Sequence, residues 1–175
     1  MIKKAIEKIR QSYKLQFLLI AMLVFTAFYK VLNFPFHANR DIGYFFQMTG
    51  GIFDVLSLIK GHAFISFLNY KLFGVNPGGW YLTGILMHIL ATWMVYILVS
   101  NLLRNRNIGF ATALWFGVST AWHDAVTIGT INSTYSAQVF LFLASLYFLK
   151  KARESKSLES YLLSYLIYSA MILIR

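Results

Sequence analysis

The sequence predicts an all-α membrane protein, a multi-spanning transmembrane helix bundle whose first outer loop carries amphipathic interfacial helices. Hydrophobic residues make up 58% of the 175 residues and charged residues only 13%, about half of the ~25% that soluble domains use to cover their surface. Several apolar stretches reach or approach the ~20 residues that a helix needs to cross a ~30 Å hydrocarbon core. Most of the 16 basic residues lie at the ends of these stretches.

The first predicted span covers residues 15–33 and follows a basic N-terminal stretch. Its single charged residue, Lys30, lies near the end of the span, where a long side chain can reach the interface. A cleaved signal peptide is the alternative, but no small-residue cleavage site follows the apolar run. We therefore interpret this segment as an uncleaved membrane anchor.

Residues 34–78 form an outer loop that is too long for a simple connection. Two runs of apolar residues in it repeat at three and four positions, with Gly61 between them. This spacing fits two short amphipathic helices in the membrane interface, although helices that simply cap the bundle would show the same pattern. The runs are Ile52, Val55, Leu56 and Ile59, and then Phe64, Phe67, Leu68 and Leu72.

The second predicted span, residues 79–103, contains no charged residue. Trp80 and Tyr81 stand at its start, as aromatic anchors do at a membrane interface. The basic turn at residues 104–107 is short enough to make the second and third spans antiparallel neighbours.

The third predicted span covers residues 108–131, but its apolar part ends at Trp122. Fifteen residues give only about 22 Å of helix, too little to cross a membrane alone. The helix must therefore continue through His123 and Asp124, or stop short and leave both side chains lining a cavity.

The fourth predicted span, residues 133–149, is followed by a charged run, and the fifth covers residues 160–175. The sequence ends inside this fifth apolar stretch. We therefore expect residues 1–175 to be the N-terminal part of a longer transmembrane domain, and we expect this part to be inactive on its own.

The basic residues predict the orientation in the membrane. The positive-inside rule makes the side that carries eleven of them cytoplasmic, and with it the N-terminus of an integral multi-pass protein of the plasma or inner membrane. The net charge of +10 is then topological and predicts no nucleic-acid partner. These residues are Lys3, Lys4, Lys8, Arg10, Lys14, Arg104, Arg106, Lys150, Lys151, Arg153 and Lys156.

Polar chemistry is predicted on the outer side. Three of the six acids (Asp41, Asp54 and Asp124) and three of the four histidines (His37, His62 and His123) fall there. An ionisable group near membrane depth, as Asp124 is predicted to be, marks a functional site by default, whereas an acid in an outer loop, such as Asp41, is usually just solvated. The chain has no cysteine, so disulfides and cysteine-based metal sites are excluded.

His88 lies near the middle of the second predicted span. It can bind substrate, or it can be a neutral imidazole that forms a hydrogen bond with a neighbouring helix.

Three stretches of the sequence resemble GT-C membrane glycosyltransferases, the relatives of protein O-mannosyltransferases and aminoarabinose transferases. The run from Asn69 to Pro77 resembles the family's N-x-x-L-F-G-x-N-P motif, and Leu86-Met87-His88 its Leu-Leu-His element. Trp122-His123-Asp124-Ala125-Val126 is similar to its H-x-E-A-V region. The resemblance covers roughly residues 34–155. In two departures, Ser119-Thr120 replaces the His-Pro of many relatives, and Asp41 is a single acid where many have two.

The resemblance implies transfer of a sugar from a polyprenyl-phosphate-linked donor to a lipid, glycan or protein acceptor on the outer face of the membrane. Asp41 would act as the catalytic base, and Asp124 would be a second carboxylate with a catalytic role. Arg40 or Lys60 would hold the donor phosphate, and His123 and His88 would contact substrate. One His beside one or two acids does not define a metal site, so cofactors stay unassigned and a divalent metal stays open. The expected partners are the lipid-linked donor and membrane lipids.

Two other functions stay open from the sequence. A transporter or lipid flippase would have helices broken by Gly or Pro at the midplane and facing charges inside the bundle. The predicted spans carry only His88 at such a depth. A non-catalytic membrane subunit would instead tolerate replacement of Asp41 and Asp124.

Overall fold

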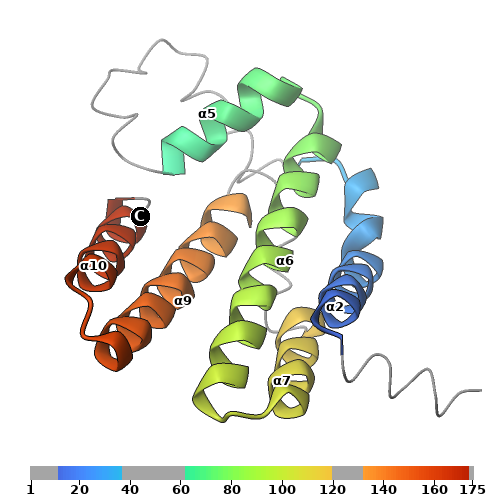
Figure 1. Ribbon diagram of the computed structural model, residues 1–175. Helices are drawn as coiled ribbons and strands as arrows, with labels where there is room; N and C mark the ends of the chain where they lie inside the picture. The colour runs from blue at the N-terminus through green and yellow to red at the C-terminus, as the bar shows by residue number, and fades with distance from the viewer. Residues whose placement is uncertain (1–11, 37–61, 120–131, 174–175) are drawn as a thin grey trace, which may run out of the picture.

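The computed structural model describes residues 12–36, 62–119 and 132–173, and within these ranges all regular structure is helical, as the sequence predicts (Figure 1). A long central helix, α6, packs against four α-helices and one 3-10 helix. In chain order the elements are α2 (Tyr13–Phe28), the 3-10 helix η1 (Tyr29–Asn33), α5 (His62–Phe73), α6 (Pro77–Leu102), α7 (Arg106–Val118), α9 (Asn132–Ser155) and α10 (Leu158–Leu173).

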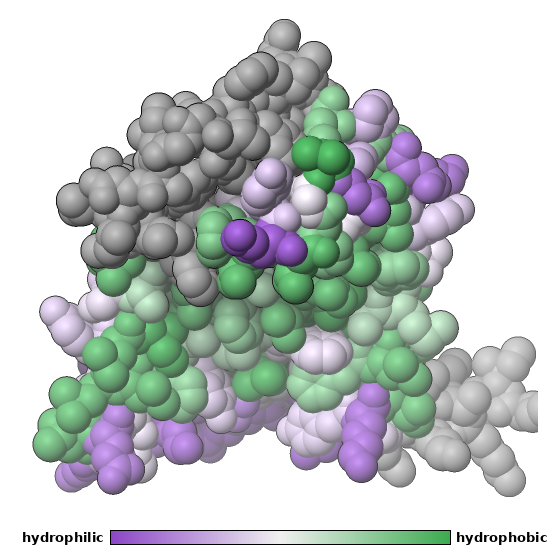
Figure 2. Space-filling model, turned by 90° about the horizontal axis from the view of Figure 1, so that it is seen from above, coloured by the Kyte–Doolittle hydropathy of each residue, from purple (hydrophilic) through white to green (hydrophobic). Residues whose placement is uncertain are grey.

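Two helical segments of the described chain are long and apolar enough to cross a membrane, Tyr13–Asn33 and Pro77–Leu102. They lie at the first and second predicted spans. Large hydrophobic side chains also remain exposed along several helices, and Figure 2 shows hydrophobic residues over much of the described surface seen from above. A monomer in water rarely exposes so much contiguous apolar surface. Among the most exposed are Trp115, Leu72, Leu158, Tyr165 and Leu166.

Helix α2 runs antiparallel to α6 and buries one face against α6 and α7. The buried residues of α2 recur every four positions, at Gln16, Ile20, Val24 and Phe28, the spacing that keeps side chains on one side of a helix. Gln16 is polar, and its side-chain oxygen accepts a hydrogen bond from the Tyr96 hydroxyl of α6. The buried Gln16 side chain therefore has a hydrogen-bond partner inside the protein, as buried polar groups usually do.

Helix α7 packs against α6 through small residues. Gly109, Ala113 and Gly117 are the buried residues of α7, again four positions apart. A Cβ atom added at Gly109 would lie 2.9 Å from the backbone nitrogen of Ser100, and one added at Gly117 would lie 2.9 Å from the Thr92 methyl group. Such close approach is typical of membrane helices, where small residues let backbones come together and gain van der Waals contact.

The Asn69–Pro77 motif builds the turn between α5 and α6. Gly74 has φ +56°, a left-handed conformation that glycine adopts without strain, and its carbonyl accepts a hydrogen bond from the Trp80 ring nitrogen at 3.0 Å. Asn76 caps α6 by accepting from the Gly78 backbone nitrogen at 3.1 Å, and Pro77 occupies the first turn, where no N–H is needed. These motif residues therefore have structural roles.

Helix α9 continues past the predicted span 133–149 and through most of the charged run. Lys150 and Glu154 form an ion pair of 2.6 Å on successive turns, and lysine, arginine and glutamate have high helix propensity. The helix ends at Ser155, before Lys156 adopts φ +52°. The apolar stretch of the sequence therefore predicts the first part of the helix and not its end. Helix α10 then packs back on α9, where the Ser164 hydroxyl donates to the Ser145 carbonyl at 2.9 Å.

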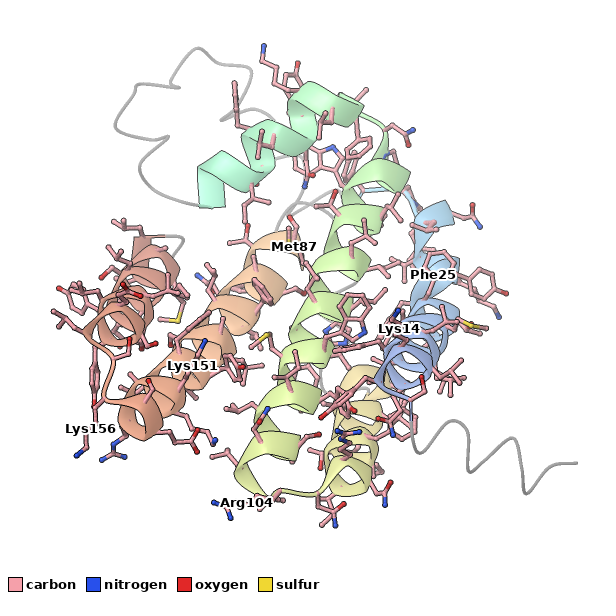
Figure 3. The ribbon with its side chains drawn as sticks, viewed as in Figure 1. Lys14, Phe25, Met87, Arg104, Lys151 and Lys156 are labelled. Atoms are coloured by element: carbon pink, nitrogen blue, oxygen red, sulfur yellow. The ribbon has the colours of Figure 1, made fainter. Side chains whose placement is uncertain are left out.

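The two ends of the bundle differ in charge. The turns after α6 and after α9 lie at the end away from α5, and Arg104 and Lys156 are found there (Figure 3). The start of α2 lies at the same end, because the Arg106 guanidinium stacks on the Tyr13 ring at 3.8 Å. We refer to this end as the basic end and to the opposite one as the α5 end.

Candidate functional site at the α5 end

Of the six candidate site residues, the structure describes only His88. Asp41, Arg40 and Lys60 fall in residues 37–61, and Asp124 and His123 fall in residues 120–131, outside the described residues. The first of the two predicted interfacial helices falls outside them as well. The described helices nevertheless fix the points where both segments leave and rejoin the bundle.

The segment with Asp41 leaves and rejoins the bundle at the α5 end. Before it, the Tyr81 hydroxyl at the start of α6 donates to the Pro35 carbonyl at 3.1 Å, and the Phe36 ring lies 5.9 Å from the Trp80 ring. After it, α5 lies across this end of α6 (Figure 1). The predicted apolar stripe of α5 stays partly exposed, with Leu72 72% accessible, as expected for a helix at an interface.

The segment with Asp124 rejoins the bundle beside α5. The Asn69 amide of α5 donates to the Ser133 hydroxyl in the first turn of α9 at 3.3 Å, and both side chains are buried. Thr134 and Ser136 follow in the same turn and are also buried, and their hydroxyl groups have no hydrogen-bond partner among the described residues. The first turn of α9 therefore places three buried hydroxyl groups at the α5 end.

Helix α7 stops halfway along α6. Its 13 residues give about 20 Å of helix, and its end contacts His88, the twelfth of the 26 residues of α6. Ser119, next along the chain, has an extended backbone with φ −64° and ψ 133°. Helix α7 therefore ends before His123 and Asp124, as one of the two alternatives from the sequence requires, but whether these two side chains line a cavity stays a prediction because both lie outside the described residues. The segment that carries His123 and Asp124 therefore starts near the middle of the bundle.

A hydrogen bond from His88 completes the end of α7. The Nε2–H group donates to the Gly117 carbonyl oxygen at 3.0 Å, and this carbonyl is one of the last four of the helix, which lack partners within it. The imidazole ring is buried between Phe28 and Phe116, with ring centroids 5.6 and 5.5 Å away. His88 therefore makes the interhelix hydrogen bond that the sequence allows, and its role in substrate binding stays a prediction.

The described residues contain no group of three or more His, Cys, Asp or Glu side chains close enough to hold a metal ion. Within these ranges the α5 end offers amide and hydroxyl groups at the start of α9 and in α5, and two lysines, Lys30 in η1 and Lys71 in α5. The candidate site residues other than His88 belong to the two segments outside the described residues, one before α5 and one between α7 and α9.

Sequence reasoning missed two features that shape this region. The buried stripe of Gly109, Ala113 and Gly117 could have been predicted from the sequence, because small residues four positions apart in an apolar helix indicate a close helix contact. The contact between Asn69 and Ser133 has none, because the two residues are 64 positions apart and only the fold brings them together.

Comparison with known proteins identifies relatives of this chain. Residues 61–175 match the family described as dolichyl-phosphate-mannose-protein mannosyltransferase. The chain is also 36% identical, over 59 residues, to the protein O-mannosyl-transferase Tmtc1 of Drosophila melanogaster. That alignment covers 34% of this chain and 7% of the relative. No solved structure matches.

The family match includes His88, His123 and Asp124 but begins one residue after Lys60. Arg40 and Asp41 also precede it. The roles expected for these three residues therefore rest on their positions and on the resemblance described above.

Proposed function

The chain belongs to the dolichyl-phosphate-mannose-protein mannosyltransferase family, and from this premise we propose that it is part of a GT-C-type membrane enzyme that transfers mannose from a polyprenyl-phosphate carrier. The acceptor would be a hydroxyl group of a protein, glycan or lipid on the outer side. The observation that carries the proposal is the family match over α5 to α10, which includes the segment with His123 and Asp124.

The proposed reaction is an inverting displacement. The acceptor hydroxyl oxygen forms a bond to the anomeric carbon of mannose, and the bond from this carbon to the phosphate oxygen breaks. Phosphate is already a good leaving group, so the enzyme needs a base for the hydroxyl proton and cations for the phosphate charge. Asp41 would take the proton, and Arg40 or Lys60 would bind the phosphate.

The early end of α7 supports an active site in this region. Inside a membrane, non-helical backbone is tolerated only where protein covers it or where it lines an aqueous cavity. The chain leaves the helical conformation at Ser119, beside the middle of α6. We infer that Asp124 and His123 form the second polar wall of a substrate cavity that opens at the α5 end.

The polar start of α9 supports the same location. A buried hydroxyl group without a hydrogen-bond partner costs about 1–3 kcal/mol, so the buried side chains of Thr134 and Ser136 need partners from outside the described residues. The proposed cavity would supply water or sugar hydroxyl groups to them.

The donor specificity can be tested directly with purified full-length protein. We expect mannose to pass to acceptor from polyprenyl-phosphate mannose and not from GDP-mannose, because the reaction uses a lipid phosphate as leaving group. The measurement is incorporation of radiolabelled mannose into acceptor. Transfer from GDP-mannose alone, or from neither donor, would contradict the proposal.

We further propose that the helices form a multi-spanning bundle with the α5 end on the outer side and the basic end in the cytoplasm. Arg104 and Lys156 lie at one end of the bundle, and Arg106, the first residue of α7, follows the same turn as Arg104. This gathering of basic residues supports the orientation through the positive-inside rule. Residues 1–175 contain no cysteine, so a single cysteine introduced among them is the only thiol in this part of the protein.

Labelling of intact cells should give opposite results at the two ends. A membrane-impermeant maleimide should label Val75→Cys, at the exposed turn after α5, without permeabilisation. Lys156→Cys, at the exposed turn between α9 and α10, should react only after permeabilisation. The reverse pattern would place the proposed site in the cytoplasm.

A further inference from the structure

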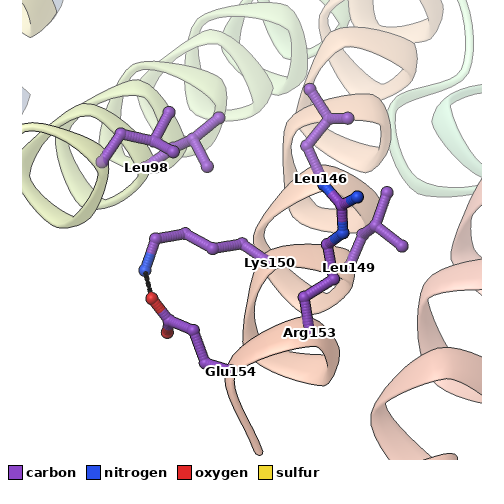
Figure 4. Close-up of a pocket in the computed structure, with 7 residues that line it drawn as sticks. Leu98, Leu146, Leu149, Lys150, Arg153 and Glu154 are labelled. Carbon is purple, nitrogen blue, oxygen red and sulfur yellow. Dashed lines mark hydrogen bonds and ion pairs between the residues drawn. The ribbon is translucent and has the colours of Figure 1, made fainter. Parts of the chain in front are cut away.

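A groove of about 300 Å³ lies between α6 and α9 at the basic end (Figure 4). It is open to the surroundings of the protein, and four of the seven residues that line it are leucines. Unfilled space of this size would forfeit van der Waals contact along both helices. The groove therefore fits a hydrocarbon chain. The leucines are Leu98 and Leu102 on α6 and Leu146 and Leu149 on α9.

Charged side chains line the same groove and leave one positive charge without a partner. The Lys150 ammonium group donates to the Glu154 carboxylate at 2.6 Å, so this pair is neutral overall. Arg153 also lines the groove, and it forms no ion pair with any residue in the described ranges. In Figure 4 the Lys150–Glu154 pair lies on the side nearer Leu98, whereas Arg153 lies beside the leucines of α9.

We propose that this groove binds an anionic phospholipid of the cytoplasmic leaflet. One acyl chain lies along the four leucines, and the phosphate group accepts hydrogen bonds from the Arg153 guanidinium. Arginine forms two parallel hydrogen bonds to a phosphate, and basic pockets between membrane helices on the cytoplasmic side are suited to anionic headgroups. The proposal relies on the membrane placement proposed above and is independent of the transfer reaction.

The position of the groove favours a phospholipid over the polyprenyl-phosphate donor. The groove lies at the basic end, whereas the segments that carry the candidate catalytic acids start and finish at the α5 end or near the middle of the bundle. The two sites are thus separated along α6. A lipid bound at the basic end would fill the space between α6 and α9 without entering the proposed cavity.

The test is lipid retention by purified full-length protein from vesicles that contain equal amounts of phosphatidylglycerol and phosphatidylcholine. Native mass spectrometry after mild detergent extraction should show phosphatidylglycerol retained in preference to phosphatidylcholine. Arg153→Gln should weaken that retention about fivefold, which corresponds to the ~1 kcal/mol of one basic residue near an anionic lipid. Leu149→Trp, which fills the groove without changing charge, should weaken it as well.

Lys151→Gln is the matched control, because Lys151 is exposed on the same helix, carries the same charge and does not line the groove. It should change retention less than twofold. Equal loss in Lys151→Gln and Arg153→Gln would overturn the proposal in favour of a diffuse basic surface. Equal retention of both phospholipids would overturn it, and so would displacement of phosphatidylglycerol by polyprenyl phosphate. Mannose transfer, measured in parallel, should be unchanged in Arg153→Gln, so failure here is distinguishable from failure of the proposed function.

Discussion

Replacing Asp41 by asparagine should lower mannose transfer by about 10²–10⁴-fold, the usual contribution of a general base. The amide keeps the size of the side chain but loses its charge and basicity, so the amount of protein in the membrane should not change. The measurement is kcat with polyprenyl-phosphate mannose as donor. A loss confined to KM would instead assign Asp41 to substrate binding.

Asp54→Asn is the control for this prediction. Asp54 lies in the same outer loop, off the apolar stripe of Ile52, Val55, Leu56 and Ile59, and a solvated acid there should change transfer by less than about threefold. If the two acids line one cavity, Asp124→Asn should lower kcat for mannose transfer as Asp41→Asn does. The kcat of the double variant should then be little lower than that of either single variant. Near-normal turnover of Asp41→Asn would move the active site out of this loop.

Replacing Ala113 by leucine should separate α7 from α6 and lower the melting temperature of the purified protein. Ala113 is fully buried between Gly109 and Gly117, where added Cβ atoms already meet the neighbouring helices. Overpacking of this kind costs about 1–3 kcal/mol, and each kcal/mol lowers the melting temperature of a domain of this size by about 2–4 °C.

The same change two positions away should have little effect. Ala111 is exposed on α7, so Ala111→Leu adds the same atoms outside the α6–α7 contact and should change the unfolding free energy by less than about 0.5 kcal/mol. Equal shifts in the two variants would show that the small residues of α7 do not set its distance from α6.

Features encoded locally in the sequence agree with the structure. The apolar stretches at residues 15–33 and 79–103 coincide with the two described segments that could cross a membrane, because length and hydropathy are properties of a single segment. The second apolar run of the outer loop forms α5. The Asn69–Pro77 run is also local, since its glycine, cap and proline act on the turn that they belong to.

Features that depend on contacts between helices were not predictable to the same degree. Sequence reasoning left two roles open for His88, and only packing brings its ring nitrogen to the Gly117 carbonyl. The end of α7 at Val118 was one of two outcomes, because a short apolar stretch does not reveal whether the helix continues. Helix α9 extends past its apolar part to Ser155, where Lys150 and Glu154 pair across one turn, and such a pair does not enter a hydropathy argument.

The shortness of α7 has a consequence for how the protein is made. A helix of 13 residues offers too little apolar length to partition into the lipid bilayer by itself as it emerges from the ribosome. Helix α6, which precedes it by a three-residue turn containing Arg104, is long enough to insert alone. We therefore expect the pair to enter the membrane as a helical hairpin. In this hairpin α6 inserts first, and α7 enters the bilayer only because it packs against α6.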